Sequence, residues 1–130
     1  MIAADTSTWI AFLEGAKGDD VELLDGALQE RHVLMVPIVL TELLSDPKLP
    51  PSLADTLSDV PMIEIEAGFW QRAGALRAKV LAKPRKARLG DALIAQTCID
   101  RGVPLITRDR DFRAFVDAAG LDIISGSAAI

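Results

Sequence analysis

Four acidic residues could form one catalytic pocket, although they lie far apart in the sequence. Asp5 and Asp109 each follow a short apolar run that predicts a buried strand. Glu42 lies inside the apolar run of a predicted helix, and Asp91 stands at the start of another helix. In doubly wound sheets, ligands bind outside the carboxyl ends of the strands. Because crossover connections in such sheets are right-handed, we expect these four carboxylates to meet above one edge of the sheet.

Carboxylates gathered in this way favour a hard metal ion. Two of them about 5 Å apart repel by about 3 kcal/mol at an effective dielectric of about 20, so the cluster needs protons or a cation to neutralise it. The sequence holds one cysteine and one histidine, and oxygen ligands suit Mg²⁺ or Mn²⁺ better than zinc. Such an ion would activate water and stabilise charge on a phosphate and on the leaving oxygen. Beside a basic surface, the pattern indicates phosphodiester hydrolysis.

Each acid also has a simpler structural interpretation. Asp91 could cap its helix, and Asp109 and Asp111 could be turn or cap residues. Asp5, at a strand end, is open to either interpretation. Glu42 has no such role, because an acid inside an apolar helix needs a partner or a cation. The coincidence of four acids at one predicted sheet edge favours a functional site.

The elements that would position these acids alternate along the chain. Short apolar runs separated by helical patterns predict an α/β fold with a mainly parallel sheet. Strands are expected over residues 2–4, 33–36, 62–65, 105–107 and 121–124. The helices expected between them begin near residues 6, 19, 37, 50, 69, 90 and 112.

Length and composition limit the possible classes of protein. The chain has 130 residues, half of them apolar, which fits a single domain over residues 1–130 and excludes a disordered chain. No apolar run reaches the length of a membrane span, and no signal peptide is visible. The single cysteine, Cys98, excludes a disulfide framework and a cysteine-based zinc cluster. We therefore expect a cytoplasmic protein.

Charge is distributed unevenly along the chain. The formal net charge is −5, but residues 1–66 hold 13 acidic and 3 basic residues, whereas residues 67–130 hold 6 acidic and 11 basic residues. Residues 67–90 contain seven basic side chains and no acid. Such asymmetry permits a phosphate-binding face on an acidic protein. A solvated helix face is the alternative explanation.

Four short motifs carry a resemblance to a known family. They are Asp-Thr-Ser at residues 5–7, Thr-Glu at 41–42, Gly-Asp-Ala-Leu-Ile-Ala at 90–95 and Leu-Ile-Thr-Arg-Asp-Arg-Asp-Phe at 105–112. In this order, and over the whole length, the chain resembles PIN-domain ribonucleases, above all the VapC-type toxins of bacterial toxin–antitoxin pairs. The resemblance implies a parallel sheet of order 3-2-1-4-5 with helices on both faces. It also implies an endoribonuclease that depends on Mg²⁺ or Mn²⁺.

The resemblance also implies roles for individual residues. Asp5, Glu42, Asp91 and Asp109 match the acidic quartet of the family. The implied metal ligands are Asp5, Asp91 and Asp109, and Glu42 would hold a metal-bound water or a second ion. The implied supporting residues, which would orient carboxylates or phosphate or extend the acidic set, are Ser7, Thr107 and Asp111. Asp111 matches a less constant position of the family and ranks below Asp109.

The expected partners are an RNA substrate, a cognate antitoxin protein and a second copy of the chain. Cleavage would leave a 5′ phosphate. The basic residues that could steer the RNA backbone are Arg72, Lys79, Lys83, Arg85 and Lys86. In the family, the antitoxin buries an apolar segment near the first helices and can place a basic side chain in the acidic pocket. Trp9, Phe12 and Leu13 are candidates for the groove that receives it.

Two other functions remain open from the sequence. The chain could be an RNA- or protein-binding module with the same fold and no catalysis, but such modules lack one or more of the acids, and all four are present here. It could also be a metal-dependent phosphatase or a nuclease with another class of substrate. A haloacid-dehalogenase-type phosphatase would require a second aspartate where Ser7 stands.

Overall fold

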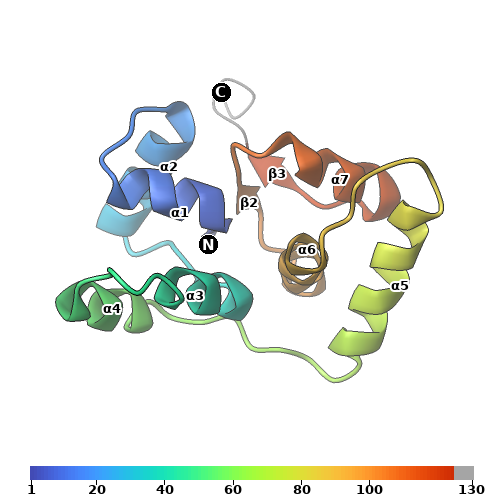
Figure 1. Cartoon of the computed structure of the whole chain (residues 1–130), viewed down its shortest axis with the longest axis horizontal. Helices are drawn as coiled ribbons and strands as arrows, with labels where there is room; N and C mark the ends of the chain where they lie inside the picture. The colour runs from blue at the N-terminus through green and yellow to red at the C-terminus, as the bar shows by residue number, and fades with distance from the viewer. Residues whose placement is uncertain (125–130) are drawn as a thin grey trace.

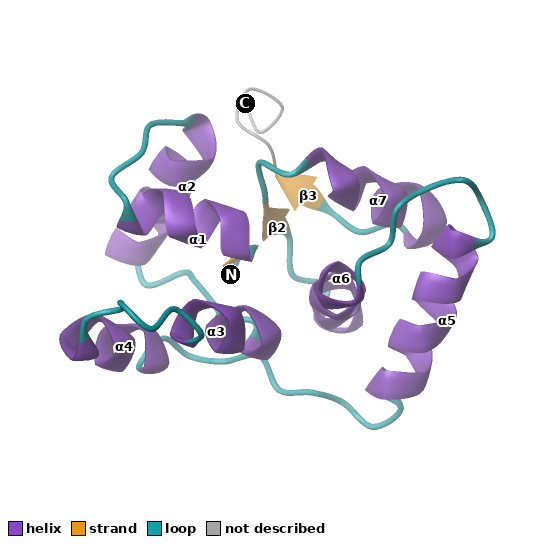
Figure 2. Cartoon of the chain, viewed as in Figure 1, coloured by secondary structure: helices purple, strands orange, loops and turns teal. Residues whose placement is uncertain are grey.

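The computed structural model describes residues 1–124, and residues 125–130 of the predicted domain lie outside this range. The elements, in chain order, are β1 (Ala3–Ala4), α1 (Thr6–Leu13), α2 (Asp19–Gln29), α3 (Pro37–Leu44), α4 (Pro51–Ser58), α5 (Phe69–Leu81), α6 (Leu89–Arg101), β2 (Leu105–Ile106), the 3₁₀ turn η1 (Arg110–Phe112), α7 (Arg113–Ala119) and β3 (Ile123–Ile124). Within residues 1–124, helices α1 to α6 lie between the first two short strands, and η1 and α7 lie between β2 and β3 (Figure 1, Figure 2). None of these helices combines the length and the apolar character that crossing a membrane requires.

The sheet is parallel, as the sequence predicts. Its strands are ordered β1-β2-β3, with Ala3 opposite Leu105 and Leu105 opposite Ile123. Parallel neighbours separated by helices confirm the α/β class. The carboxyl ends of β1 and β2 lie at the same edge, so the residues that follow these two strands become neighbours.

The strands predicted over residues 33–36 and 62–65 are shorter than expected. They appear as isolated parallel bridges, Ile2 with Val33 and Met35 with Met62. Proline limits both segments, because Pro37 begins α3 and Pro61 has no N–H to donate to a ladder. The described three-stranded ladder therefore leaves the full five-strand order a prediction.

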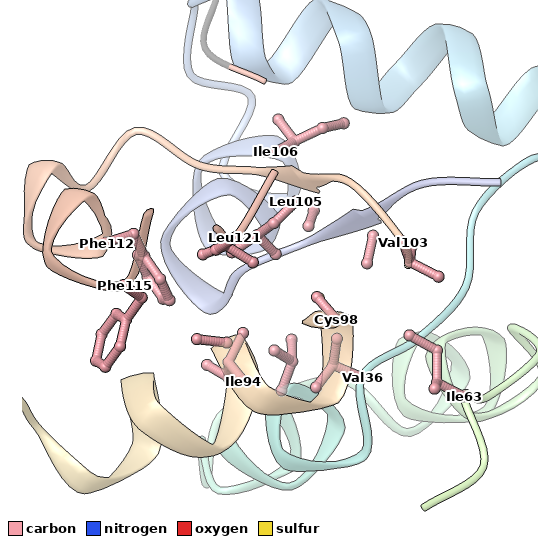
Figure 3. Packing of buried hydrophobic residues seen from close by; sticks show 14 of the residues in the cluster. Val36, Ile63, Ile94, Cys98, Val103, Leu105, Ile106, Phe112, Phe115 and Leu121 are labelled. Carbon is pink, nitrogen blue, oxygen red and sulfur yellow. The ribbon is translucent and has the colours of Figure 1, made fainter. Parts of the chain in front are cut away.

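Helices pack on both sides of β2. Contacts join α2 to β2 on one side, and Figure 3 shows Ile94 and Cys98 of α6 facing Leu105 from the other side. Leu105 and Cys98 are fully buried. The core therefore fixes α6 against the sheet, with the first turn of α6 close to the site edge.

The end of α6 is set by local chemistry. Gly102 has φ 63°, a left-handed conformation that glycine adopts at little cost. Pro104 then favours an extended chain leading into β2. At the other end of the sheet edge, Pro37 occupies the first position of α3, where its missing N–H is not needed.

Candidate active site

Asp5 is the most buried of the four predicted acids. It follows β1 at 2 % exposure and caps α1, where its Oδ1 accepts a hydrogen bond from the Thr8 N–H at 3.0 Å. Ser7 Oγ donates to the same carboxylate at 2.9 Å, and Thr107 Oγ1 donates to Oδ2 at 2.6 Å. Burial raises the pKa of the Asp5 carboxyl, while these hydrogen bonds oppose the rise. The three donors hold Asp5 in one orientation.

Thr107 connects two of the acids. While its hydroxyl donates to Asp5, the same oxygen accepts a hydrogen bond from the Asp109 N–H at 3.0 Å. Asp109 then caps the turn η1, its Oδ1 accepting from the Asp111 N–H at 2.9 Å. Asp109 is therefore both a cap and a member of the acidic group, so the two interpretations of this residue are compatible.

Asp91 does not cap its helix, contrary to the simpler interpretation of the sequence. Helix α6 begins at Leu89, its N-cap is Arg88, and no side chain makes a capping hydrogen bond there. Burial first, and then the negative charge of Asp109, raise the pKa of the Asp91 carboxyl to about 6, although the positive charge of Arg88 opposes the rise. Asp91 is therefore a carboxylate among other acids, with Arg88 as an opposing charge but no ion pair within residues 1–124.

Glu42 completes the group from α3. Its Oε1 accepts a hydrogen bond from Thr6 Oγ1 at 2.7 Å. A Cβ at Gly90 would lie 3.8 Å from Glu42 Oε2, which places Glu42 over the first turn of α6. A cavity of about 220 Å³ lies at this edge, and its lining comprises Asp5, Thr6, Ser7, Ile10, Glu42, Arg88, Asp91, Ile94 and Asp109. The four acids, from four separate stretches of sequence, therefore line one cavity.

The tightest acidic cluster differs from the predicted metal ligands. Oxygens of Asp91, Asp109 and Asp111 lie within 4.8 Å of one another. The prediction named Asp5 in place of Asp111. Asp5 lines the same cavity, and its oxygens accept hydrogen bonds that orient them, so its role as a ligand stays a prediction. The turn η1 brings Asp111 back toward Asp109, which the Asp-x-Asp spacing could have suggested. Three carboxylates, one of them with a raised pKa, form a donor set that fits Mg²⁺ or Mn²⁺.

Arg88 is a site residue that the sequence did not single out. It lines the acidic cavity, and its charge acts on Asp91. In the sequence it is one of seven basic residues between positions 67 and 90. Its place two residues before Gly90 of the Gly-Asp motif was the available signal.

An ion pair between the exposed Arg108 and the buried Asp20 supports the segment that carries Asp109. Arg108 donates to both oxygens of Asp20, from Nε at 2.8 Å and from Nη2 at 2.9 Å, and Thr8 Oγ1 donates to Asp20 at 2.9 Å. The Arg108 hydrogen bonds lower the pKa of Asp20. This network joins α1 and α2 to the chain that follows β2. Asp20 lies in the first turn of α2.

The basic residues predicted to steer RNA do not line the acidic cavity. Arg72 donates to Asp100 from Nε and Nη2, at 3.0 and 2.6 Å. Lys79 donates to the Ala118 carbonyl and Arg85 to Asp117. The other two, Lys83 and Lys86, form no ion pair within residues 1–124. Three of the five therefore have partners within the chain, and RNA steering by this surface stays a prediction.

The groove near the first helices is lined by one of the three expected residues, Leu13, and not by Trp9 or Phe12. Trp9 is buried at 2 % exposure, and of the three candidates only Leu13 lines the cavity between α1, α3 and α4. That cavity has a volume of about 600 Å³, and its lining comprises Ile10, Leu13, Glu14, Glu42, Leu43, Asp46, Leu49, Pro50 and Leu53. Glu42 belongs to both this cavity and the acidic one. The apolar groove therefore adjoins the acidic site.

Similar proteins share the length and fold of this chain. Ribonuclease VapC5 of Mycobacterium tuberculosis is 28% identical over 126 residues, which cover 92% of this chain and 91% of that protein. The crystal structure of VapBC2 from Rickettsia felis, bound to a DNA fragment from its promoter, aligns with a TM-score of 0.72 at 21% identity, covering 96% of this chain and 98% of that one. VapBC-5 from M. tuberculosis aligns with a TM-score of 0.68 at 22% identity, covering 95% and 97%.

A family model gives the broadest assignment. The model of the PIN domain matches residues 2–117, which include all four acids of the cavity. The match spans most of the chain, and the structural alignments show the same fold. This chain belongs to the PIN domain family.

Proposed function

We propose that this protein is a Mg²⁺- or Mn²⁺-dependent endoribonuclease and the toxin of a type II toxin–antitoxin pair. The observation that carries the proposal is the single cavity lined by Asp5, Glu42, Asp91 and Asp109. The 28% identical relative is named a ribonuclease, and the aligned structures are VapBC assemblies, which supports the same function. A module without catalysis would have no need to gather four mutually repelling acids.

The ion in this proposal would be held by the closest carboxylates. Asp91, Asp109 and Asp111 are the candidate ligands, with Asp5 and Glu42 beside them. When bound, the ion would lower the pKa of water and neutralise charge that develops on the phosphate.

The chain's own residues would position that chemistry. Thr107 fixes the Asp5 carboxylate and the Asp109 backbone together, and Thr6 holds Glu42. Such supporting hydrogen bonds keep ligand oxygens in place and set their basicity. Arg88, at the cavity wall, supplies a positive charge that could bind a phosphate oxygen of the substrate.

The groove beside the site suits an antitoxin segment. It joins apolar side chains such as Leu13 and Leu53 to the acids Glu14, Glu42 and Asp46. An apolar segment carrying a basic residue would fill the groove and neutralise Glu42 at the same time. For the proposed homodimer, Trp70 of α5, 63% exposed, and Leu89 at the start of α6 are apolar contact candidates.

Cleavage of defined RNAs tests the proposed function. We expect the wild-type protein to cut single-stranded RNA in Mg²⁺, to stop when a chelator is added, and to leave 5′ phosphates. Activity that persists in excess chelator would contradict the metal dependence. Binding of RNA without cutting under any divalent ion would favour the non-catalytic alternative.

Replacing Thr107 by valine should weaken the site while keeping its shape. The change removes the hydroxyl that contacts Asp5 and Asp109 and leaves buried polar groups unsatisfied. We expect the free energy of unfolding to fall by about 1–3 kcal/mol and cleavage to fall by about 10- to 100-fold, measured by denaturation and by initial rates at a temperature where the variant is folded.

A matched control separates the two effects. Thr97 is also buried, and its hydroxyl donates only to the Leu93 carbonyl within α6, at 2.7 Å. Thr97→Val should leave the cleavage rate unchanged. Equal losses of activity in both variants would show that Thr107 acts only through stability.

Metal affinity should depend on pH through Asp91. A metal ligand must be deprotonated, and the pKa of Asp91 is raised to about 6. The apparent Kd for Mg²⁺ should therefore be constant well above that pH and rise by about tenfold per unit below it. Calorimetric titrations across this range measure the change. An affinity that stays constant through the range would remove Asp91 from the ligand set.

A further inference from the structure

A second cavity adjoins the acidic site on the far side of Asp109. Its volume is about 190 Å³, and its lining comprises Thr107, Arg108, Asp109, Arg110, Arg113 and Ile123. Asp109 and the segment after β2 form the wall between the two cavities, because Asp109 lines both. Three of the six lining residues are arginines, although the chain as a whole carries a net charge of −5.

The three arginines differ in their partners. Arg108 donates to Asp20 and to the Lys17 carbonyl, which anchors this wall of the cavity. Arg110 and Arg113 are exposed, and neither forms a side-chain hydrogen bond or an ion pair within residues 1–124. Within that part of the chain, two guanidinium groups at the cavity are therefore available to bind an anion.

The nearby acids do not neutralise this pair. Asp111 belongs to the cluster with Asp91 and does not line the arginine cavity. Asp117 accepts its hydrogen bond from Arg85, at 2.7 Å, and this bond is the main cause of the lowered pKa of Asp117. The positive charge of Arg113 contributes less to that lowering. Of the charged residues 108–113, the three arginines thus line only the second cavity, whereas Asp109 lines both.

We propose that Arg110 and Arg113 form a subsite for a backbone phosphate of the RNA strand, next to the phosphate that is cut. The inference rests on the proposed ribonuclease function. A strand entering the acidic cavity meets repulsion from the carboxylates, and a cationic pocket sharing the Asp109 wall offsets it at the neighbouring phosphate. Guanidinium groups bind phosphate oxygens in a bidentate geometry and carry no base preference. The subsite therefore sets the position of the strand and not its sequence.

A matched pair of basic residues outside the subsite controls for net charge. Arg31 and Lys48 are exposed, form no ion pair within residues 1–124 and line neither cavity. If Arg110 and Arg113 hold a phosphate, neutralising them weakens RNA binding, whereas neutralising Arg31 and Lys48 does not. The two pairs of substitutions, Arg110→Gln with Arg113→Gln and Arg31→Gln with Lys48→Gln, change the net charge equally. Thermal melts of both double variants establish that each is folded.

The test measures binding of a short fluorescein-labelled single-stranded RNA by anisotropy at several salt concentrations. Asp91→Asn is present in every protein so that the probe is not cut. We expect the arginine double variant to bind at least about tenfold more weakly, with a salt slope smaller by about 0.7 for each phosphate that the variant no longer neutralises. In the otherwise wild-type protein, the same pair should raise KM more than it lowers kcat.

The results separate this inference from the function on which it rests. Wild-type protein that cuts and binds RNA, with affinity and salt slope unaffected by the arginine pair, overturns the subsite alone. An equal loss in the variant carrying Arg31→Gln and Lys48→Gln also overturns it, because the effect would then be one of net charge. Wild-type protein that neither binds nor cuts RNA overturns the proposed function as well. RNA probes that carry one neutral methylphosphonate linkage, placed at a different position in each probe, locate the bound phosphate. At one position the neutral linkage should weaken binding to the protein with both arginines and leave binding to the arginine double variant unchanged.

Discussion

Asp91→Asn is expected to reduce RNA cleavage by more than the roughly 100-fold that loss of a supporting residue costs at a metal site. Asparagine keeps the size of the side chain but removes one of three carboxylates that lie within 4.8 Å of one another. It also removes the group whose pKa burial and the neighbouring acids raise to about 6. Initial rates on a defined RNA at saturating Mg²⁺ measure the effect.

Asp19→Asn is the matched control for this variant. Asp19 also lies in the first turn of a helix, α2, but it is exposed and forms no side-chain hydrogen bond within residues 1–124. The Asp19→Asn variant should cleave RNA at the wild-type rate. If Asp91→Asn cleaves as fast as Asp19→Asn, Asp91 has no part in catalysis.

The same Asp91→Asn substitution should stabilise the fold in the absence of metal. Because the pKa of Asp91 is higher in the folded chain than its ordinary 3.8, the folded state binds the proton more tightly. The contribution of the protonated Asp91 to the free energy of unfolding of the wild type is therefore lost as the pH rises from 3.8 to about 6. The full shift corresponds to about 3 kcal/mol, and since Asp91 is only half-buried, screening by water reduces this to about 1 kcal/mol.

Denaturation at two pH values detects this gain. The Asn variant should unfold with a higher free energy than the wild type at pH 7, and the two should converge near the ordinary pKa of aspartate. A variant that is less stable than wild type at neutral pH would show that a partner stabilises the Asp91 carboxylate, which would contradict its placement among uncompensated acids.

Mg²⁺ or Mn²⁺ should stabilise the wild-type protein substantially. An ion that binds only the folded state adds about 2.7 kcal/mol at one hundred times its Kd. The acidic cluster gives an additional reason, because the cation removes the repulsion that the carboxylates suffer without it. We expect the melting temperature to rise with ion concentration and to level off only slowly.

The ion-dependent rise in melting temperature can be compared between the wild type and two aspartate variants. Asp109→Asn removes a member of the cluster and should lose most of the ion-dependent rise, whereas Asp19→Asn should keep it. An equal rise in all three proteins would mean that the ions act on the general surface charge. No rise in the wild type with either ion would count against the metal centre itself.

Much of the site could be predicted because its residues break local rules. Glu42 interrupts an apolar helical run, which points to a function beyond folding, whereas Asp5 at a strand end becomes informative only together with the other acids. The parallel order of β1 and β2 then places Asp5 beside Thr107. These inferences need only strand direction and chain connectivity, which hydrophobic periodicity indicates well.

The rest depends on contacts between residues distant in sequence. The Arg108–Asp20 pair spans 88 residues and the Arg72–Asp100 pair 28, and composition cannot identify such partners. The membership of Asp111 depends on the 3₁₀ turn at Arg110–Phe112, and the donors that orient Asp5 are brought together only in the folded chain. Side-chain pairing, more than secondary structure, separates the observed site from the predicted one.

Anomalous scattering from crystals soaked in Mn²⁺ tests the proposed metal centre most directly. We expect a peak among the carboxylates of Asp91, Asp109 and Asp111 in wild-type crystals and its loss in Asp91→Asn crystals. Crystals of a protein that cuts RNA in the same Mn²⁺ solution, yet show no peak in this cavity, would contradict the assignment.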